Sequence, residues 1–251
     1  MIELYENERL DEVNDRLRLI QKTDGLTFGT DALLLAGYIS EKFKLGCELG
    51  GGCGIISMLL LTREKIERTD CVEIQPEYAE LIRRNAELNS LSDRLVSVNA
   101  DIRELPKEAK YDIIYTNPPY MRSDSGYANS ASKKNIARHE VFGTIADFCN
   151  ASAKLLKFGG SFVAVYRPDR LTDIIAAMRA ARLEPKRITF VHARATSEAS
   201  MVLIEARLGS GVGAYLTRPL IIYDGEKYGR DMNYIMENGS FPEDFYIGNR
   251  R

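Results

Sequence analysis

The tetrapeptide Asn-Pro-Pro-Tyr, from Asn117 to Tyr120, directly follows an apolar run at residues 111–116. Proline lacks an amide N–H and fixes its own φ, so two consecutive prolines cannot continue a central strand. A side-chain amide, a rigid carbonyl and an aromatic ring therefore stand together where a buried strand ends. Such a group is either an abrupt turn or a rigid cup that holds something flat.

A glycine-rich segment, CELGGGCG from Cys47 to Gly54, follows an earlier strand pattern and opens a helical one. Glycines let the backbone turn sharply and approach a ligand, with a helix N-terminus beyond. A dinucleotide fingerprint would need a third glycine at residue 55, which is isoleucine. The pattern E-x-G-x-G-x-G therefore argues against NAD or FAD, and without Gly-Lys-Ser/Thr the segment is not a P-loop.

Two acidic residues end the next two predicted strands. Glu73 is placed to accept hydrogen bonds from a ribose diol. Asp101 is placed to meet an adenine amino group, with Ile102 packing on the ring. Since open parallel sheets bind ligands at the carboxyl ends of their strands, the two acids and the glycine-rich segment predict one ligand site.

Apolar, β-rich runs alternate with helical patterns through the middle of the chain. The predicted strands are 45–49, 69–74, 95–100, 111–116 and 161–165, and the predicted helices are 54–63, 76–89, 144–156 and 167–182. This alternation indicates βαβ units and a parallel sheet covered on both faces. Two last strands, 187–191 and 200–208, are joined by about eight residues, which suits an antiparallel pair.

The chain is predicted to have three parts. They are an N-terminal hairpin and helix that pack on the core, a cofactor-binding core, and a C-terminal extension, at residues 1–40, 41–208 and 209–251. The hairpin is expected between 17–20 and 26–28, with the helix starting at Thr30. The extension begins with the flexible-linker composition Gly-Ser-Gly-Val-Gly and continues into a short strand at 219–223.

The glycine pattern, the strand-end acids and Asn-Pro-Pro-Tyr together resemble class I S-adenosylmethionine-dependent methyltransferases that modify amino nitrogens. FGTDALLLAGYI (28–39), ARHE (137–140) and PLIIYDGEKY make the chain similar to the bacterial valine-tRNA adenine N6-methyltransferase family, which modifies the adenine beside the anticodon. The resemblance implies an α/β, Rossmann-like fold with a seven-stranded, mostly parallel sheet ending in an antiparallel hairpin. It also implies S-adenosyl-L-methionine as the cofactor and tRNA as the partner.

The resemblance further implies the site residues. The cofactor-binding residues are Phe28, Thr30, Asp31, Glu48, Gly50, Gly52, Gly54, Glu73, Ile74, Asp101, Ile102 and Asn117. The catalytic residues are Asn117, Pro118, Pro119 and Tyr120, and the substrate-binding residues are Tyr120, Arg122, Lys133, Lys134 and Arg138. One departure is Glu48, where the family usually has aspartate. His139 and Glu140 are expected to anchor the substrate loop rather than act as an acid–base pair.

The chemistry of an exocyclic amine explains the tetrapeptide. Its nitrogen is a poor nucleophile because the lone pair is delocalised into the ring. The Asn117 side-chain oxygen and the Pro118 carbonyl can accept the two N–H groups and favour a pyramidal nitrogen aimed at the sulfonium methyl, so much of the catalysis would be orientation. Tyr120 supplies a face for the flipped base.

Charge and composition limit the partners. The formal net charge is −2, so any RNA-binding charge must be local. Lys and Arg outnumber Asp and Glu by three in 122–138 and by four in 167–194, which makes both stretches candidate phosphate contacts.

Four cysteines without a C-x-x-C pair and only two histidines indicate buried thiols and no metal site. With no signal peptide and no membrane span, a cytoplasmic monomer or weak homodimer is expected.

Other functions fit parts of the pattern. A glutamine N5-methyltransferase acting on peptide-release factors would use the same tetrapeptide, but that family carries a helical domain where only about 45 residues precede the glycine-rich segment here. Guanine N2-methyltransferases more often have phenylalanine in place of Tyr120. DNA adenine methylation would call for a target-recognition domain. A non-catalytic RNA-binding protein on the same scaffold would not need Asn117 or the intact glycine pattern.

Overall fold

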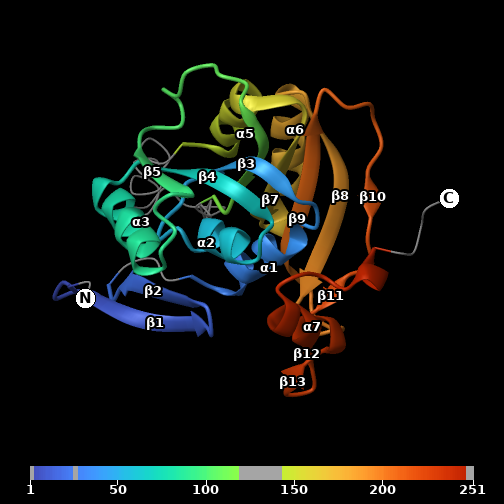
Figure 1. The fold of residues 1–251 in the computed structure, drawn as a ribbon. Helices are drawn as coiled ribbons and strands as arrows, with labels where there is room; N and C mark the ends of the chain where they lie inside the picture. The colour runs from blue at the N-terminus through green and yellow to red at the C-terminus, as the bar shows by residue number, and fades with distance from the viewer. Residues whose placement is uncertain (1–2, 25–27, 119–142, 247–251) are drawn as a thin grey trace, which may run out of the picture.

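The computed structural model describes residues 3–24, 28–118 and 143–246 of the 251-residue chain. A nine-stranded sheet runs through the centre of this described part (Figure 1). Its seven long strands lie in the order β5 (Leu95–Asn99), β4 (Ile66–Glu73), β3 (Phe43–Leu49), β6 (Tyr111–Thr116), β7 (Leu156–Tyr166), β9 (Ala199–Leu208) and β8 (Leu183–His192).

The direction of the strands confirms the predicted topology. Neighbours from β5 to β7 are parallel, while β9 is antiparallel to both β7 and β8. Two short strands, β10 (Tyr215–Leu216) and β11 (Leu220–Ile221), also pair with β8. They raise the number of strands from the predicted seven to nine, because two-residue strands are too short to leave a readable alternation.

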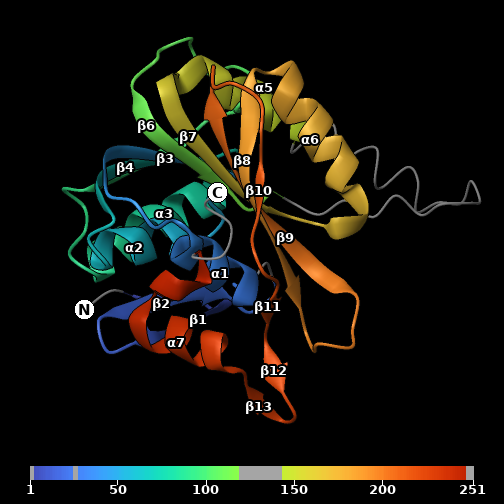
Figure 2. The same ribbon diagram turned by 90° about the vertical axis from the view of Figure 1, so that its right-hand side faces the viewer.

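Helices cover both faces of the sheet, as the alternating pattern predicts. One face carries α1 (Thr30–Tyr38), α2 (Ile55–Thr62) and α3 (Pro76–Leu88), and the other carries α5 (Ile145–Leu155) and α6 (Leu171–Ala180), which follows the 3₁₀ turn η1 (Pro168–Arg170). Local signals set their starts: Pro76 opens α3, and Thr144 with Asp147 forms a capping box for α5. Figure 2 shows α5 and α6 on the opposite side of the sheet from α1, α2 and α3. Each face has its own cluster of buried apolar side chains.

The N-terminal strands form a hairpin that the sequence did not predict. β2 (Leu17–Lys22) pairs with β1 (Glu8–Asn14), which precedes it. The predicted partner of β2 at 26–28 lies mostly outside the described part of the chain. The sequence of β1, ERLDEVN, is largely charged and has no buried residue, so its pattern carries no strand signal. β2 by contrast buries Leu17, Leu19 and Ile20 in the main core.

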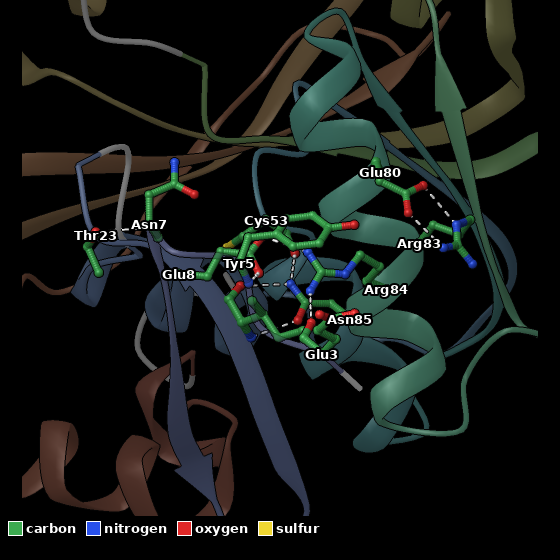
Figure 3. Close-up of polar contacts among 11 residues, drawn as sticks. Glu3, Tyr5, Asn7, Glu8, Thr23, Cys53, Glu80, Arg83, Arg84 and Asn85 are labelled. Atoms are coloured by element: carbon green, nitrogen blue, oxygen red, sulfur yellow. Dashed lines mark hydrogen bonds and ion pairs between the residues drawn. The ribbon is translucent and has the colours of Figure 1, made fainter. Parts of the chain in front are cut away.

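Helix α3 holds this hairpin against the core (Figure 3). The guanidinium of Arg84 lies 2.6 Å from Glu8 and its centre is 4.1 Å from the Tyr5 ring centroid. The Asn85 side chain accepts from the Ile20 amide at 2.7 Å and donates to the Cys53 carbonyl at 3.0 Å. Asn85 therefore ties β2 to the glycine-rich segment.

The C-terminal extension packs beside α1. It contains the hairpin β12 (Tyr223–Asp224) and β13 (Lys227–Tyr228), helix α7 (Arg230–Asn238) and the 3₁₀ turn η2 (Glu243–Phe245). Phe241 and Phe245 are buried in the core cluster that contains α1, and the Phe241 ring meets Tyr38 edge-on at 5.5 Å. No helix in the described part of the chain is long and apolar enough to cross a membrane.

Candidate active site

The glycine-rich segment forms a tight loop between β3 and α2. Gly50, Gly52 and Gly54 all have positive φ, at 73°, 55° and 81°. Only glycine adopts this left-handed region without a steric cost, which explains the spacing of the pattern. The amides of Gly50 and Gly51 donate to the Val72 carbonyl at 2.9 and 3.0 Å, so the loop is fixed to the end of β4.

Glu73 lies directly beside this loop, as the sequence predicted. One carboxylate oxygen accepts from the Gly52 amide at 2.9 Å and the other from the Gln75 amide at 3.0 Å. The residue is only 5% exposed. Because a carboxylate offers about four acceptor positions, these two bonds fix its orientation and leave capacity for a ligand hydroxyl.

The end of β5 is held close to the end of β4 by Asn99, a residue that the sequence analysis did not single out. Its side chain donates to the carbonyls of Glu73 and Ile74 at 2.9 and 3.0 Å. The next residues are the predicted adenine contacts. Asp101 is partly buried, and bonds from Arg103 lower the pKa of its carboxyl, while Ile102 is buried.

Glu48 is enclosed in the core at 1% exposure. It accepts from both the amide and the hydroxyl of Ser57, at 3.0 and 2.5 Å, and Cys71 Sγ lies 3.5 Å away. Ser57 is the third residue of α2, so Glu48 satisfies an amide that the helix leaves free at its start. Through these contacts Glu48 holds the start of α2 in place after the glycine loop. Its predicted contact with the cofactor stays a prediction.

This buried carboxyl makes stability depend on pH. Burial raises the pKa of Glu48 to about 7, from 4.5 for an ordinary glutamate. The folded state then binds the proton more tightly than the unfolded chain, so wild-type stability should fall as pH rises from about 4.5 to about 7. Glu48→Gln keeps an acceptor but does not titrate, and should flatten this part of the curve.

Urea unfolding at a series of pH values measures the effect. The difference in unfolding free energy between Glu48→Gln and wild type should shift in favour of the variant as pH rises. Glu12→Gln, which changes an exposed carboxyl of β1, is the control and should follow the wild-type curve. Parallel curves for Glu48→Gln and wild type would mean that Glu48 does not titrate in this range.

Asn117 directly follows β6 and is the residue that the sequence predicts to bind the reacting amine of the substrate. Its Nδ2 donates to Asp31 Oδ2 at 2.8 Å, whereas its Oδ1 is buried without a hydrogen-bond partner among the described residues. Next to it, Thr116 donates to the Leu49 carbonyl at 2.7 Å, which aligns the ends of β6 and β3. Pro118 is buried. The remaining predicted residues of this region lie outside the described part of the chain: Pro119, Tyr120, Arg122, Lys133, Lys134, Arg138, His139 and Glu140.

The start of α1 lies next to Asn117. The Phe28 amide donates to the side chain of the buried Gln21 at 2.9 Å, which fixes the approach to the helix. Thr30 and Asp31 then form its first turn. The structure therefore brings Asp31 and Asn117 together.

A cavity of about 1070 Å³ opens beside Asp31. It is lined by Thr30, Asp31, Tyr166, Arg167, Pro168, Asp169, Glu198, Ala199, Ser200 and Met201. These residues come from the start of α1, from the segment that runs from the end of β7 into η1, and from the start of β9 with the residue before it. Neither Asn117 nor a residue of the glycine loop is among the residues that line it.

The basic stretch 167–194, which the structure describes throughout, is largely paired. Four of its seven basic residues form ion pairs with acidic residues: Arg167 with Asp169, Arg170 with Asp173, Arg179 with Glu184 and Arg187 with Glu205. Arg187 is also mostly buried between the rings of Tyr38 and Tyr246. The stretch 122–138 is therefore the main candidate for the predicted phosphate contacts.

The cysteines are buried thiols, as predicted, and the described residues contain no group of His, Cys, Asp or Glu that could hold a metal ion. Burial raises the pKa of the Cys53 thiol to about 12, which keeps it protonated and unreactive at neutral pH.

The strand order, the antiparallel β9 and a glycine loop joined to an acid at the end of β4 define a class I methyltransferase. A family model described as methyltransferase small domain matches residues 23–178. The chain therefore belongs to this methyltransferase family, and the predicted class, fold and S-adenosylmethionine dependence are confirmed.

Individual relatives are similar over most of their length. The tRNA1(Val) (adenine(37)-N6)-methyltransferase of Porphyromonas gingivalis is 28% identical over 202 residues, 76% of this chain and 78% of its own. The protein of the same name from Phocaeicola vulgatus is 30% identical over 179 residues, 70% and 74% of the two chains. A solved structure described as a predicted O-methyltransferase, protein Atu636 from Agrobacterium tumefaciens, has a TM-score of 0.69 at 25% identity and covers 84% of this chain and 98% of that one.

Proposed function

We propose that this methyltransferase modifies the exocyclic N6 amine of an adenine in the anticodon loop of a valine tRNA. The names of the relatives from Porphyromonas gingivalis and Phocaeicola vulgatus support the substrate. The observation that carries the chemistry is the buried Oδ1 of Asn117, which has no hydrogen-bond partner among the described residues. A buried polar atom without a partner costs free energy, so its presence at the end of β6 favours a role in binding an N–H group.

The residues around the glycine loop fit the cofactor. A Cβ added to Gly52 would meet nothing within 4 Å, so the backbone here is open to a close-lying ligand. Glu73 retains acceptor capacity for the ribose hydroxyls, and Asp101 with Ile102 stands at the next strand end for the adenine. When bound, S-adenosylmethionine supplies an electrophilic methyl group on a sulfonium centre.

The protein's own part in the reaction is orientation. Asn117 Oδ1 and the carbonyl of Pro118 accept the two N–H bonds of the target amine and favour a pyramidal nitrogen whose lone pair faces the methyl group. The nucleotide that carries this amine has to be turned out of its stack to reach Asn117. No side chain has to remove a proton before the methyl group is transferred.

The product of the reaction tests this function. Radiolabelled methyl transfer to tRNA from a strain lacking the gene should give N6-methyladenosine in valine tRNA by nucleoside mass spectrometry. Methylglutamine in a release factor would instead assign the chain to the glutamine N5-methyltransferases. If the radiolabel is incorporated into neither tRNA nor a release factor, the proposal is overturned.

Salt dependence tests the RNA contacts. Lys133→Ser with Lys134→Ser should weaken tRNA binding and lower the slope of log K against log salt by about 2, because each neutralised phosphate releases a counterion. Cofactor affinity should stay nearly unchanged. The matched control is Lys42→Ser with Lys44→Ser, two exposed lysines at the amino end of β3. An equal loss of slope in both double variants would remove the stretch 122–138 from the RNA interface.

A further inference from the structure

The bond between Asp31 and Asn117 joins two elements that are far apart in sequence. Asp31 lies in the first turn of α1 and Asn117 directly follows β6, and the Asn117 Nδ2 donates to Asp31 Oδ2 at 2.8 Å. The other oxygen of Asp31 accepts from the Ala32 amide at 2.9 Å. Both carboxylate oxygens are therefore engaged, one by the helix backbone and one by the side-chain amide.

The chemistry of the two groups fixes the orientation of the amide. An ionised carboxylate can only accept hydrogen bonds, whereas an amide donates through Nδ2 and accepts through Oδ1. Asn117 must therefore turn its nitrogen toward Asp31, which leaves Oδ1 on the opposite side. That oxygen is buried and has no partner among the described residues.

The local backbone makes room for this arrangement. A Cβ added to Gly29, the residue that caps α1, would lie only 2.9 Å from Asp31 Oδ1. Any larger residue at this position would push the carboxylate out of place. Asp31 also lines the cavity of about 1070 Å³.

We propose that Asp31 is a positioning residue that locks the Asn117 amide with its oxygen toward the target amine. This assignment rests on the proposed function of Asn117 and replaces the expected role of Asp31 in cofactor binding. The fixed amide also lets the site discriminate between an amino group and a carbonyl on a purine. An oxygen aimed at the substrate accepts from an amino group, whereas a carbonyl at the same position of a purine would face an acceptor and be left unpaired.

Enzyme kinetics provide the first test. Asp31→Ala frees the amide to rotate and should lower kcat about 10- to 100-fold, as expected when a reacting group is held less accurately. Affinity for S-adenosylhomocysteine should stay within about twofold of wild type. Asp31→Asn, which can accept or donate, should give an intermediate kcat. The matched control is Asp24→Ala, which removes an exposed carboxylate seven residues upstream.

A double-mutant cycle separates positioning from a general effect on folding. If Asp31 acts through Asn117, Asp31→Ala should cause almost no further loss of kcat in an Asn117→Ala background. Additive losses would overturn the proposal. So would a loss of cofactor affinity that matches the loss of kcat, because Asp31 would then serve the cofactor.

An NMR measurement without substrate tests the bond between Asp31 and Asn117 independently of the reaction. In wild-type protein, the ¹⁵N-labelled side-chain amide of Asn117 should give one shifted, slowly exchanging N–H signal, identified by its absence in Asn117→Ala. Asp31→Ala should return it to an ordinary position, and an unchanged signal would contradict the bond. A wild-type protein that methylates a different amine would revise the proposed function, while this spectrum would still decide the role of Asp31.

Discussion

Asn117→Ala is expected to lower kcat about 100- to 1,000-fold, the range for removing one preorganised hydrogen-bonding group from an active site. The affinity for S-adenosylmethionine should stay within about threefold of wild type. The reason is that Oδ1 has no partner among the described residues, so its function is met only when a substrate is present. Single-turnover methylation and calorimetry with the cofactor measure the two quantities separately.

A fully buried asparagine, Asn85, shows the contacts of a side chain with a purely structural role. Asn85 accepts from the Ile20 amide and donates to the carbonyls of Ile20 and Cys53, so its oxygen and its nitrogen are both satisfied within the fold. Asn117 also donates through its nitrogen, but its oxygen has no partner among the described residues. Replacing Asn85 should therefore lower stability, whereas replacing Asn117 should mainly lower turnover.

The control for Asn117→Ala is Asn233→Ala, which removes a side chain of α7 that donates to the Tyr228 carbonyl. This variant should methylate at the wild-type rate. If Asn117→Ala also kept wild-type kcat, the target amine would not be oriented by this side chain. A fall in melting temperature as large as that of Asn85→Ala would instead give Asn117 a structural role.

The parallel core could be predicted because its signals are local. Apolar runs, Pro76 at a helix start and the glycine pattern each need only a few neighbouring residues. The carboxyl ends of parallel strands meet at one edge, so Glu73 could be placed near Gly52 without knowledge of the fold. The bond of 2.9 Å between the Gly52 amide and Glu73 agrees with that prediction.

The features that the sequence did not reveal depend on long-range contacts. β1 is recognisable as a strand only beside β2, because its charged residues gain no apolar face of their own. The contact between Asp31 and Asn117 joins residues that are 86 positions apart and has no local pattern. Glu48 could be identified as the usual first-strand acid, but its enclosure by Ser57 and Cys71 follows from how α2 packs.

Two adjacent glycines of the loop should respond differently to alanine, because one substitution mainly affects stability and the other mainly affects cofactor affinity. A Cβ on Gly51 would lie 2.2 Å from Cys71 Sγ and 3.1 Å from Ile82, so Gly51→Ala overpacks the core and should cost about 1–3 kcal/mol of stability. A Cβ on Gly52 would meet nothing within 4 Å, and only its positive φ of 55° is strained. Gly52→Ala should therefore cost about 1 kcal/mol in folding.

The two variants should differ just as clearly in cofactor binding. The methyl group of Gly52→Ala occupies the open side of the loop, so we expect at least a tenfold loss of affinity for S-adenosylmethionine by calorimetry. Thermal unfolding of Gly51→Ala should show the larger fall in melting temperature, and adding Cys71→Ala should restore part of it by removing the clashing sulfur. Wild-type affinity in Gly52→Ala would place the cofactor away from this glycine, because a ligand against the loop cannot share that space with a methyl group.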